Sequence, residues 1–291
     1  MRKIAVTGAT GHFGQATIAQ LIQNGIHPSK ITGLVRNQTK AQNLKELGIE
    51  LKEGDYDHFD SLVDVFQEVE KLLLISGTDL ENRLTQHLNV IRAAKEAGVQ
   101  HVYYTSFDRK TENPDSSLAF LASSHIQTEQ ALKESGMKYT IFRNNLYLSV
   151  LPMFLGEQVL ENGIFFPAGN GKAAFADRAD LAEAVANVMA ESGHENQEYV
   201  MGNSENYDFE QIATKLSQLS GKQITYVSPD SNAYSEVLTD AGVPSPYIAM
   251  FVGFAEAIQS GEFETANSDL EKLLGRKPLT LDAYLGQTYG S

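Results

Sequence analysis

The chain has 291 residues, a length that fits one large domain or two small ones, and its net charge is −14 with no run of lysine or arginine. A nucleic-acid-binding surface needs a basic stripe to neutralise phosphates, so we expect no nucleic-acid partner. Cysteine is absent, which excludes disulfides and thiol chemistry, and no apolar run is long enough for a membrane span or a signal peptide, so we expect a cytoplasmic protein without a membrane partner.

Short apolar runs alternate with longer helical patterns in the first half of the chain, up to about Asn145. Several of these runs are rich in Ile, Val, Leu and Tyr, as strands buried on both faces should be. The predicted strands are Lys3–Thr7, Ile31–Val35, Glu50–Lys52, Lys71–Ile75, His101–Thr105 and Lys138–Phe142. The predicted helices between them are Gly14–Asn24, Gln38–Leu47, Ser61–Gln67, Glu81–Ala97 and Ser117–Ser135. This alternation predicts right-handed βαβ units, and therefore an α/β fold built on a doubly wound, Rossmann-type parallel sheet.

The rhythm changes after Asn145, where short strands and helices follow one another less regularly. The predicted strands are Ile164–Phe166, Tyr199–Gly202 and Gln223–Val227. The predicted helices are Ala179–Glu191, Phe209–Ser220, Ser231–Ala241, Pro246–Ser260 and Asp269–Leu274. We expect residues 1–148 to form the Rossmann core, and residues 149–291 to form a smaller C-terminal substrate lobe that also completes the core.

Local signals mark several helix ends. Asp208 with Gln211, and Ser268 with Glu271, have the spacing of a capping box at a helix start. Glycine in a left-handed conformation often ends a helix, and four positions fit that role: Gly98, Gly136, Gly221 and Gly275.

A glycine-rich turn, Gly8-Ala9-Thr10-Gly11-His12-Phe13-Gly14, directly follows the first predicted strand and opens a helix. In such a turn Gly8 makes the tight bend, Gly11 lets backbone N–H groups approach a pyrophosphate, and Gly14 lets the helix pack closely. The helix N-terminus adds partial positive charge. Because the glycine triplet has the strand and the helix that the motif requires, we interpret residues 8–13 as a dinucleotide-binding loop.

The residues after the second predicted strand bear on the choice of cofactor. A site that prefers NAD usually has an acidic residue there, whereas this chain has Val35-Arg36-Asn37. Arg36 could pair with a 2′-phosphate and stack on adenine, which favours NADPH. The alternative is a solvated arginine at a strand end.

The carboxyl ends of the other strands are expected to meet at the same cleft. Asp55 is either an acceptor for the adenine amino group or a turn residue. The remaining candidates for cofactor contact follow the fourth, fifth and sixth strands: Ser76, Gly77, Thr78, Thr105, Asn144, Asn145 and Tyr147. His and acidic residues show no metal-ligand spacing, so we expect no metal.

Taken together, these segments resemble the NmrA-like, atypical branch of the short-chain dehydrogenase/reductase superfamily, and within it the quinone oxidoreductase type 2 and triphenylmethane reductase group. The segments that carry the resemblance are Ala5–Gly11, Ile31–Asn37, Lys71–Ser76, Tyr104–Ser106, Tyr139–Asn144 with Tyr147, Gly193–Asn196, Gly275–Pro278 and Thr280–Asp282. The resemblance implies that the loop 8–13, Arg36, residues 76–78 and residues 144–149 contact NADP(H). It also implies a cleft for a flat acceptor such as a quinone or a dye.

The chain departs from the commoner members of that superfamily, which use a tyrosine four residues before a lysine for proton transfer. No tyrosine lies between Tyr104 and Tyr139, and Leu121 and His125 occupy that spacing instead. We therefore expect hydride transfer without this pair, for which an electron-poor acceptor is suited because its proton can come from water. No residue is assigned as the proton donor.

Several other residues have two interpretations each. His125 is either a general acid or a helix residue near the cleft without a role in proton transfer. Tyr104 either orients a substrate oxygen or belongs to the sheet core, and Lys172 either approaches a ligand or is a solvated turn lysine. The apolar segment Tyr247–Phe254 could roof the acceptor site, pack in the core or contact a second subunit, so a homodimer is one assembly that the sequence allows.

Two functions of different classes fit this sequence. The first is an NADPH-dependent reductase that transfers hydride to a quinone or a similar conjugated acceptor, such as a triphenylmethane-type dye. The second is a redox sensor that binds NAD(P) and regulates a partner without catalysis. The same glycine loop supports both, while the missing tyrosine slightly favours the sensor and the resemblance along the C-terminal half favours the reductase.

Overall fold

The computed structural model describes residues 3–113 and 116–290 of the chain. Among these residues, seven strands form one sheet in the order β3-β2-β1-β4-β5-β6-β8, in which every neighbouring pair is parallel. The strands are β1 (Lys3–Val6), β2 (Ile31–Val35), β3 (Glu50–Glu53), β4 (Val69–Leu74), β5 (His101–Phe107), β6 (Lys138–Asn144) and β8 (Gln197–Met201). The predicted doubly wound parallel sheet is confirmed.

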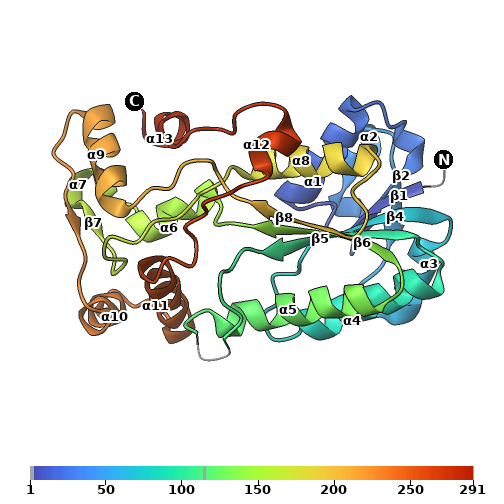
Figure 1. Cartoon of the computed structure of the whole chain (residues 1–291), viewed down its shortest axis with the longest axis horizontal. Helices are drawn as coiled ribbons and strands as arrows, with labels where there is room; N and C mark the ends of the chain where they lie inside the picture. Colours follow the sequence, from blue (N-terminus) through green and yellow to red (C-terminus); the bar gives the residue numbers. More distant parts are fainter. Residues whose placement is uncertain (1–2, 114–115, 291) are drawn as a thin grey trace.

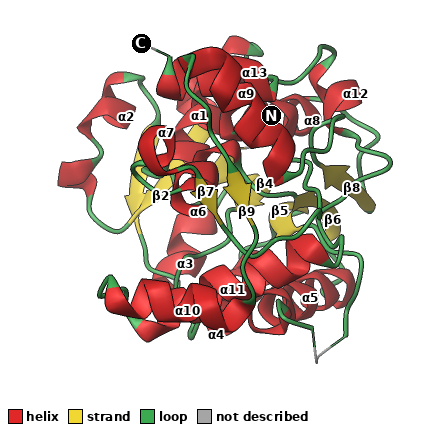
Figure 2. Cartoon of the chain, turned by 90° about the vertical axis from the view of Figure 1, so that its left-hand side faces the viewer, coloured by secondary structure: helices red, strands yellow, loops and turns green. Residues whose placement is uncertain are grey.

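Helices cover both faces of this sheet (Figure 1, Figure 2). One face carries α1 (His12–Gln23), α2 (Gln42–Glu46) and α8 (Arg178–Ala190). The other face carries α3 (Phe59–Phe66), α4 (Arg83–Glu96) and α5 (Ala119–Glu134). The strand order reverses between β1 and β4. Sheets of this kind bind ligands beyond the carboxyl ends of their strands at such a reversal.

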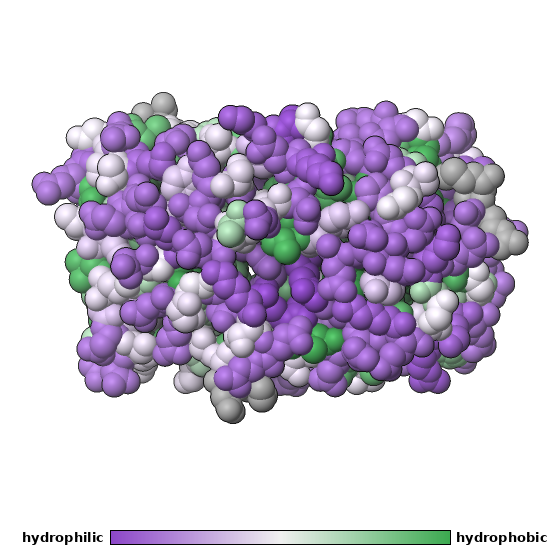
Figure 3. Space-filling view, in the orientation of Figure 1, coloured by the Kyte–Doolittle hydropathy of each residue, from purple (hydrophilic) through white to green (hydrophobic). Residues whose placement is uncertain are grey.

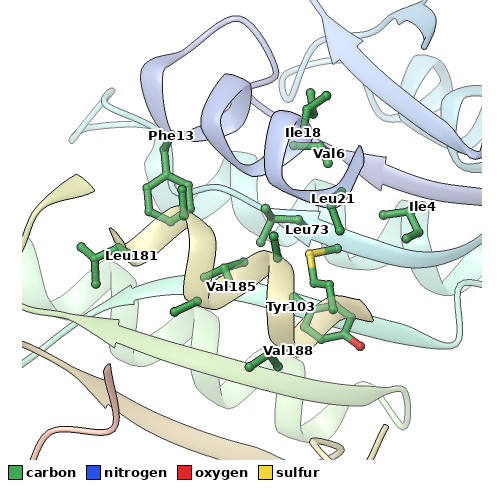
Figure 4. Close-up of a cluster of buried hydrophobic side chains, with 14 of the residues drawn as sticks. Ile4, Val6, Phe13, Ile18, Leu21, Leu73, Tyr103, Leu181, Val185 and Val188 are labelled. Carbon is green, nitrogen blue, oxygen red and sulfur yellow. The ribbon is translucent and has the colours of Figure 1, made fainter. Parts of the chain in front are cut away.

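Helices α1 and α8 pack against each other, although they are far apart in the sequence. Figure 4 shows Leu21 of α1 beside Leu73 of β4, and Phe13 of α1 on the side of Leu181 of α8, and all four side chains are buried. Burying one such side chain contributes roughly 1.5–3 kcal/mol. The chain thus returns to the sheet after residue 149, to add α8 and the edge strand β8.

The remaining elements gather at one end of the molecule, on the left in Figure 1, and we call them the small lobe. They are α6 (Leu151–Leu155), α7 (Val159–Asn162), α9 (Phe209–Ser220), α10 (Ser231–Asp240), α11 (Ser245–Gln259), α13 (Leu281–Tyr289) and the parallel pair β7 (Ile164–Phe165) and β9 (Tyr226–Val227). Their core is aromatic: the Phe154 and Phe209 rings lie 4.9 Å and 4.8 Å from the Phe166 ring. Helix α12 (Leu270–Leu274) instead packs beside α8 (Figure 1).

Some predicted boundaries were wrong. The helix predicted at Gln38–Leu47 is divided into a 3-10 turn, Gln38–Lys40, and α2. The Asn37 side chain caps the 3-10 turn by accepting a hydrogen bond from the Thr39 amide at 2.8 Å. The division falls at Ala41, whose backbone (φ −118°, ψ 29°) leaves the helical conformation. Helices α6, α7 and α13 were not predicted at all. The first two have only five and four residues, too few to show a helical period.

The two predicted capping boxes have different outcomes. Asp208 and Gln211 form theirs at the start of α9, as predicted. Ser268 does not form a capping box with Glu271, because the helix starts only at Leu270. The Ser268 hydroxyl donates to the Gly202 carbonyl and accepts the Leu270 amide at 3.1 Å. The four glycines predicted to end helices all have positive φ, between 70° and 80°.

Candidate functional site

The predicted glycine turn lies at the carboxyl end of β1. Gly8 has φ +57°, a left-handed conformation that favours glycine, and the Gly11 amide donates to the Gly8 carbonyl at 2.9 Å. Helix α1 then begins at His12, without a side-chain cap and without an acidic residue in its first turn. Within the described residues, the amides of His12, Phe13 and Gly14 have no hydrogen-bond acceptor. This helix start can therefore bind an anion.

Close packing explains the third glycine. A Cβ atom at Gly14 would lie 2.4 Å from the Gly8 carbonyl oxygen and 2.9 Å from Cα of Ala9. Gly14 thus lets α1 approach the turn, as predicted. Ala9 and Phe13 point their side chains into the core, so they can offer a ligand only backbone groups, whereas His12 is exposed.

A cleft of about 390 Å³ opens beside this turn. It brings together the carboxyl ends of β1, β2, β3 and β4, where the parallel topology predicted a ligand site. The predicted candidates that line it are Gly8, Thr10, Gly11, Arg36, Asp55, Ser76, Gly77 and Thr78. Lining residues not predicted from the sequence include Tyr56, Asp57, Asp79 and Gln86. Tyr56 and Asp57 directly follow Asp55 and could have been found there, whereas Gln86 lies on α4 and has no such signal.

Arg36 lies at the end of β2, is exposed, and makes no ion pair within the described residues. Its guanidinium is therefore available to a ligand phosphate in the cleft. Asp55 also faces the cleft, and its carboxylate accepts a hydrogen bond from the Asp57 amide at 3.1 Å. Asp55 thus has the contact of a turn residue and also lines the cleft, while its role as an acceptor for the adenine amino group stays a prediction.

Thr105 supports the cleft from behind. Its hydroxyl oxygen accepts the Ser76 amide at 2.9 Å, and the side chain is 2% exposed, so it does not line the cleft. The sequence placed Thr105 among direct contacts because it is close to the end of β5. The structure gives it a supporting position one layer further in.

The end of β6 provides a second group of polar residues at the same sheet edge. Asn144 is buried, its amide nitrogen donates to the Tyr147 hydroxyl at 3.3 Å, and its Oδ1 atom has no partner within the described residues. Arg178 lies over the Tyr147 ring at 5.0 Å. Neither Asn144 nor Tyr147 lines the cleft described above.

Asn145 serves as a junction instead. Its amide nitrogen donates to the Asp108 carboxylate at 2.8 Å and to the Phe263 carbonyl at 3.1 Å, and its Oδ1 accepts the Leu146 amide. Burial raises the pKa of Asp108, although the hydrogen bonds from Asn145 and Thr265 act against this. These contacts connect the loop after α11 to the ends of β5 and β6. The amide nitrogen and Oδ1 of Asn145 are thus both hydrogen-bonded within the protein.

His125 is buried rather than free in the cleft. Its Nδ1 atom lies 2.7 Å from the Tyr104 hydroxyl, and its Nε2 atom lies 3.3 Å from an Arg83 nitrogen. Burial lowers the pKa of His125 well below its ordinary value, and the nearby charge of Arg83 lowers it further. Tyr104 is fully buried in the sheet. These surroundings favour the interpretation of both residues as internal structure.

The other candidates lie in the small lobe. Lys172 is half-buried and makes no ion pair within the described residues. In α11, Phe251 and Phe254 pack around Phe154 with ring centroids 6.5 Å and 5.8 Å away, while Tyr247 stays 55% exposed. Core packing therefore accounts for part of the apolar segment 247–254. The face seen in Figure 3 is largely hydrophilic with scattered apolar side chains, so it offers no broad apolar patch to the predicted homodimer, which stays a prediction.

In the described parts of the chain, no helix is both long and apolar enough to cross a bilayer. His, Asp and Glu side chains there form no group of three that could hold a metal ion.

Comparison with known families gives a match along nearly the whole sequence. The model of the NmrA-like family matches residues 1–285. The chain belongs to the NmrA-like family. The resemblance inferred from the glycine turn and the strand ends is confirmed.

Several similar proteins are named as oxidoreductases or reductases. Quinone oxidoreductase 2 of Escherichia coli (strain K12) is 38% identical over 279 residues, which cover 96% of each chain. Among solved structures, the triphenylmethane reductase of Citrobacter sp. complexed with NADP(H) is 34% identical, with a TM-score of 0.89 over 98% of this chain and 99% of that one. An NADPH-dependent quinone oxidoreductase from Escherichia coli complexed with NADPH is 36% identical, with a TM-score of 0.90 over 99% and 100%.

Proposed function

We propose that this protein is an NADPH-dependent reductase that transfers hydride to a quinone or a similar conjugated acceptor, such as a triphenylmethane-type dye. The observation that carries the proposal is the cleft itself, in which the uncapped start of α1 and the unpaired Arg36 flank one cavity. The names of the relatives support the same chemistry.

The residues present fit a dinucleotide phosphate. The free amides at the start of α1 would hold the diphosphate, because they combine unsatisfied donors with the positive end of the helix dipole. Arg36 would pair with the 2′-phosphate and Asp55 would accept a hydrogen bond from adenine. Gly8, Gly11 and the half-exposed loop 76–78 would line the path of the ligand.

The nicotinamide end would reach the end of β6, further along the same sheet edge. The free Oδ1 atom of Asn144 would accept a hydrogen bond there, and the Tyr147 ring would form part of the wall. We place Asn145 one layer behind these residues, because its side chain holds the loop after α11.

Bound NADPH supplies the hydride, that is, two electrons and one proton. For a quinone, one further proton completes the hydroquinone, and we propose that water provides it. His125 is a poor donor because its ring is buried, neutral and hydrogen-bonded at both nitrogens. The protein then contributes binding, orientation and shielding from water, which suffice for an electron-poor acceptor.

A steady-state assay tests this proposal. NADPH oxidation is followed with and without small quinones and triphenylmethane dyes, and NADH is compared at equal concentrations. The proposal expects acceptor-dependent oxidation with a preference for NADPH. Tight NADPH binding in calorimetry without turnover of any acceptor would instead favour the non-catalytic sensor, which should distinguish oxidised from reduced cofactor.

A further inference from the structure

The loop after β4 is held by an unusual set of side chains. Three consecutive backbone amides each donate to a side chain from a different element: Ile75 to Thr7 Oγ1 at 2.9 Å, Ser76 to Thr105 Oγ1 at 2.9 Å, and Gly77 to His87 Nε2 at 3.0 Å. These amides are therefore unavailable to a ligand. Any polar contact from this backbone must come from its carbonyl groups.

Two of the three carbonyls are also bound within the protein. Ile75 accepts the Tyr56 hydroxyl at 3.1 Å, and Gly77 accepts Arg83 Nε at 2.7 Å. Within the described residues, the Ser76 carbonyl has no hydrogen-bond donor. It is thus the backbone acceptor that this loop leaves free, on a residue that lines the cleft.

His87 holds Gly77 as a neutral ring of defined tautomer. Because Nε2 accepts the Gly77 amide, the ring proton must lie on Nδ1, which donates to Thr128 Oγ1 at 3.0 Å. Thr128 in turn donates to the Ser124 carbonyl at 2.6 Å. A proton added to Nε2 would face the Gly77 amide, so the clamp requires the neutral ring.

Arg83 closes a ring of hydrogen bonds. It contacts Gly77 through Nε and His125 through a terminal nitrogen, and His125 bonds to Tyr104. The Tyr104 hydroxyl lies 3.5 Å from His87 Nδ1, and His87 also bonds to Thr128. All five side chains are at most 6% exposed. The Gly77 backbone is therefore fixed on both its N–H and its C=O by one buried network.

We propose that His87 and Arg83 are positioning residues for the dinucleotide: they fix Gly77 in one orientation before binding and leave the Ser76 carbonyl as the acceptor for a ribose hydroxyl. This inference rests on the proposed function. A loop ordered in advance loses no conformational freedom when the ligand binds, so the network increases affinity without touching the ligand.

His87→Leu removes the clamp, and His87→Gln keeps an acceptor for the Gly77 amide. We expect His87→Leu to raise the Kd and KM for NADPH roughly tenfold, the effect of one good hydrogen bond, with a much smaller change in kcat. His87→Gln should recover most of the affinity. The matched control is His101→Leu, which also deletes a buried neutral histidine bonded to a threonine, but at the opposite edge of the sheet. It should lose stability and keep the NADPH affinity.

The outcomes separate this inference from the proposed function. If the wild type binds no NADPH, the proposed function fails and the inference fails with it. If the wild type binds NADPH and folded His87→Leu binds it equally well, only the positioning role is overturned. A variant that does not fold leaves hydrogen exchange of the wild type as the test: without ligand, the Gly77 amide should be strongly protected, and exchange at the rate of an open loop would overturn the proposal.

Discussion

Arg109 and Glu129 form a bidentate ion pair, with nitrogen–oxygen distances of 2.9 Å and 3.0 Å and with both side chains only 3% exposed. Glu129 also binds Arg143 and Ser106, so one carboxylate joins α5 to the ends of β5 and β6. Burial alone would raise the pKa of Glu129, but the hydrogen bonds from Arg109, Arg143 and Ser106 outweigh it and lower the pKa to about 2.

Glu129→Gln should therefore destabilise the protein by up to about 3–5 kcal/mol, because Arg109 and Arg143 lose the buried carboxylate that they share. They keep only their more exposed partners, Glu112 and Glu198. Since the folded pKa is depressed, the contribution of Glu129 is fully present above its unfolded pKa of about 4.5 and is lost as the pH falls toward 2. Urea unfolding at neutral pH measures the loss. Glu134→Gln, an exposed change at the end of the same helix, should cost less than about 0.5 kcal/mol. Equal unfolding midpoints for the two variants would contradict this account.

Gly14→Ala should weaken both folding and NADPH binding. The added methyl would lie 2.4 Å from the Gly8 carbonyl, so α1 must move away from the turn at a cost of about 1–3 kcal/mol. Thermal unfolding with and without NADPH measures both effects. Gly286→Ala is the control: nothing lies within 4 Å of the added atom in α13, and alanine there should leave stability unchanged or raise it by up to about 1 kcal/mol. A Gly14→Ala protein as stable as the control would show that the turn is not tightly packed.

Arg36→Ala should shift the choice of coenzyme. Loss of a charged hydrogen bond to the 2′-phosphate costs about 1.5–3 kcal/mol, so the KM for NADPH should rise about 10- to 100-fold while that for NADH changes little. Lys95→Ala removes a cation from the last turn of α4, at the opposite edge of the sheet, and should alter neither value. If Arg36→Ala kept its preference for NADPH, another residue would have to recognise the phosphate.

His101 should make folding sensitive to mild acid. Its Nε2 atom donates to Thr140 Oγ1 at 2.8 Å, and burial, followed by the charge of Lys71, lowers the pKa to about 4. Its contribution to stability is thus fully present above the unfolded pKa of about 6.5 and is lost as the pH falls toward 4, at up to about 1.4 kcal/mol per pH unit. The stability difference between wild type and His101→Gln should shrink over this range. A difference that stays constant as the pH falls from about 6.5 to about 4 would contradict this account.

The sequence predicted the sheet because several of its strands are apolar runs, and it located the glycine turn and Arg36 because each follows such a run. Strand ends were harder. β5 and β6 each extend two residues beyond their predicted ends, since Ser106, Phe107, Arg143 and Asn144 still pair in register, and pairing with a neighbour is not visible in a single strand.

The hydrogen-bond network behind the cleft could not be predicted from local sequence patterns. His87, Thr128 and Arg83 meet only because α4 and α5 lie side by side on one face of the sheet, so no spacing in the sequence marks them as partners. For the same reason, the sequence did not identify Gln86 as a residue of the cleft. It placed Thr105 in direct contact with the cofactor, whereas in the structure Thr105 supports the loop after β4 from behind. Contacts between residues that are far apart in the sequence could be identified only from the folded structure.

The position of α8 has a consequence for how the protein is made. During synthesis, the first six strands of the sheet leave the ribosome before α8 exists, so apolar side chains of α1 such as Phe13 and Leu21 stay exposed until α8 has emerged. A nascent chain ending near residue 150 should therefore be a substrate for chaperones. A fragment truncated at that residue should be insoluble, although it contains the whole glycine-rich motif.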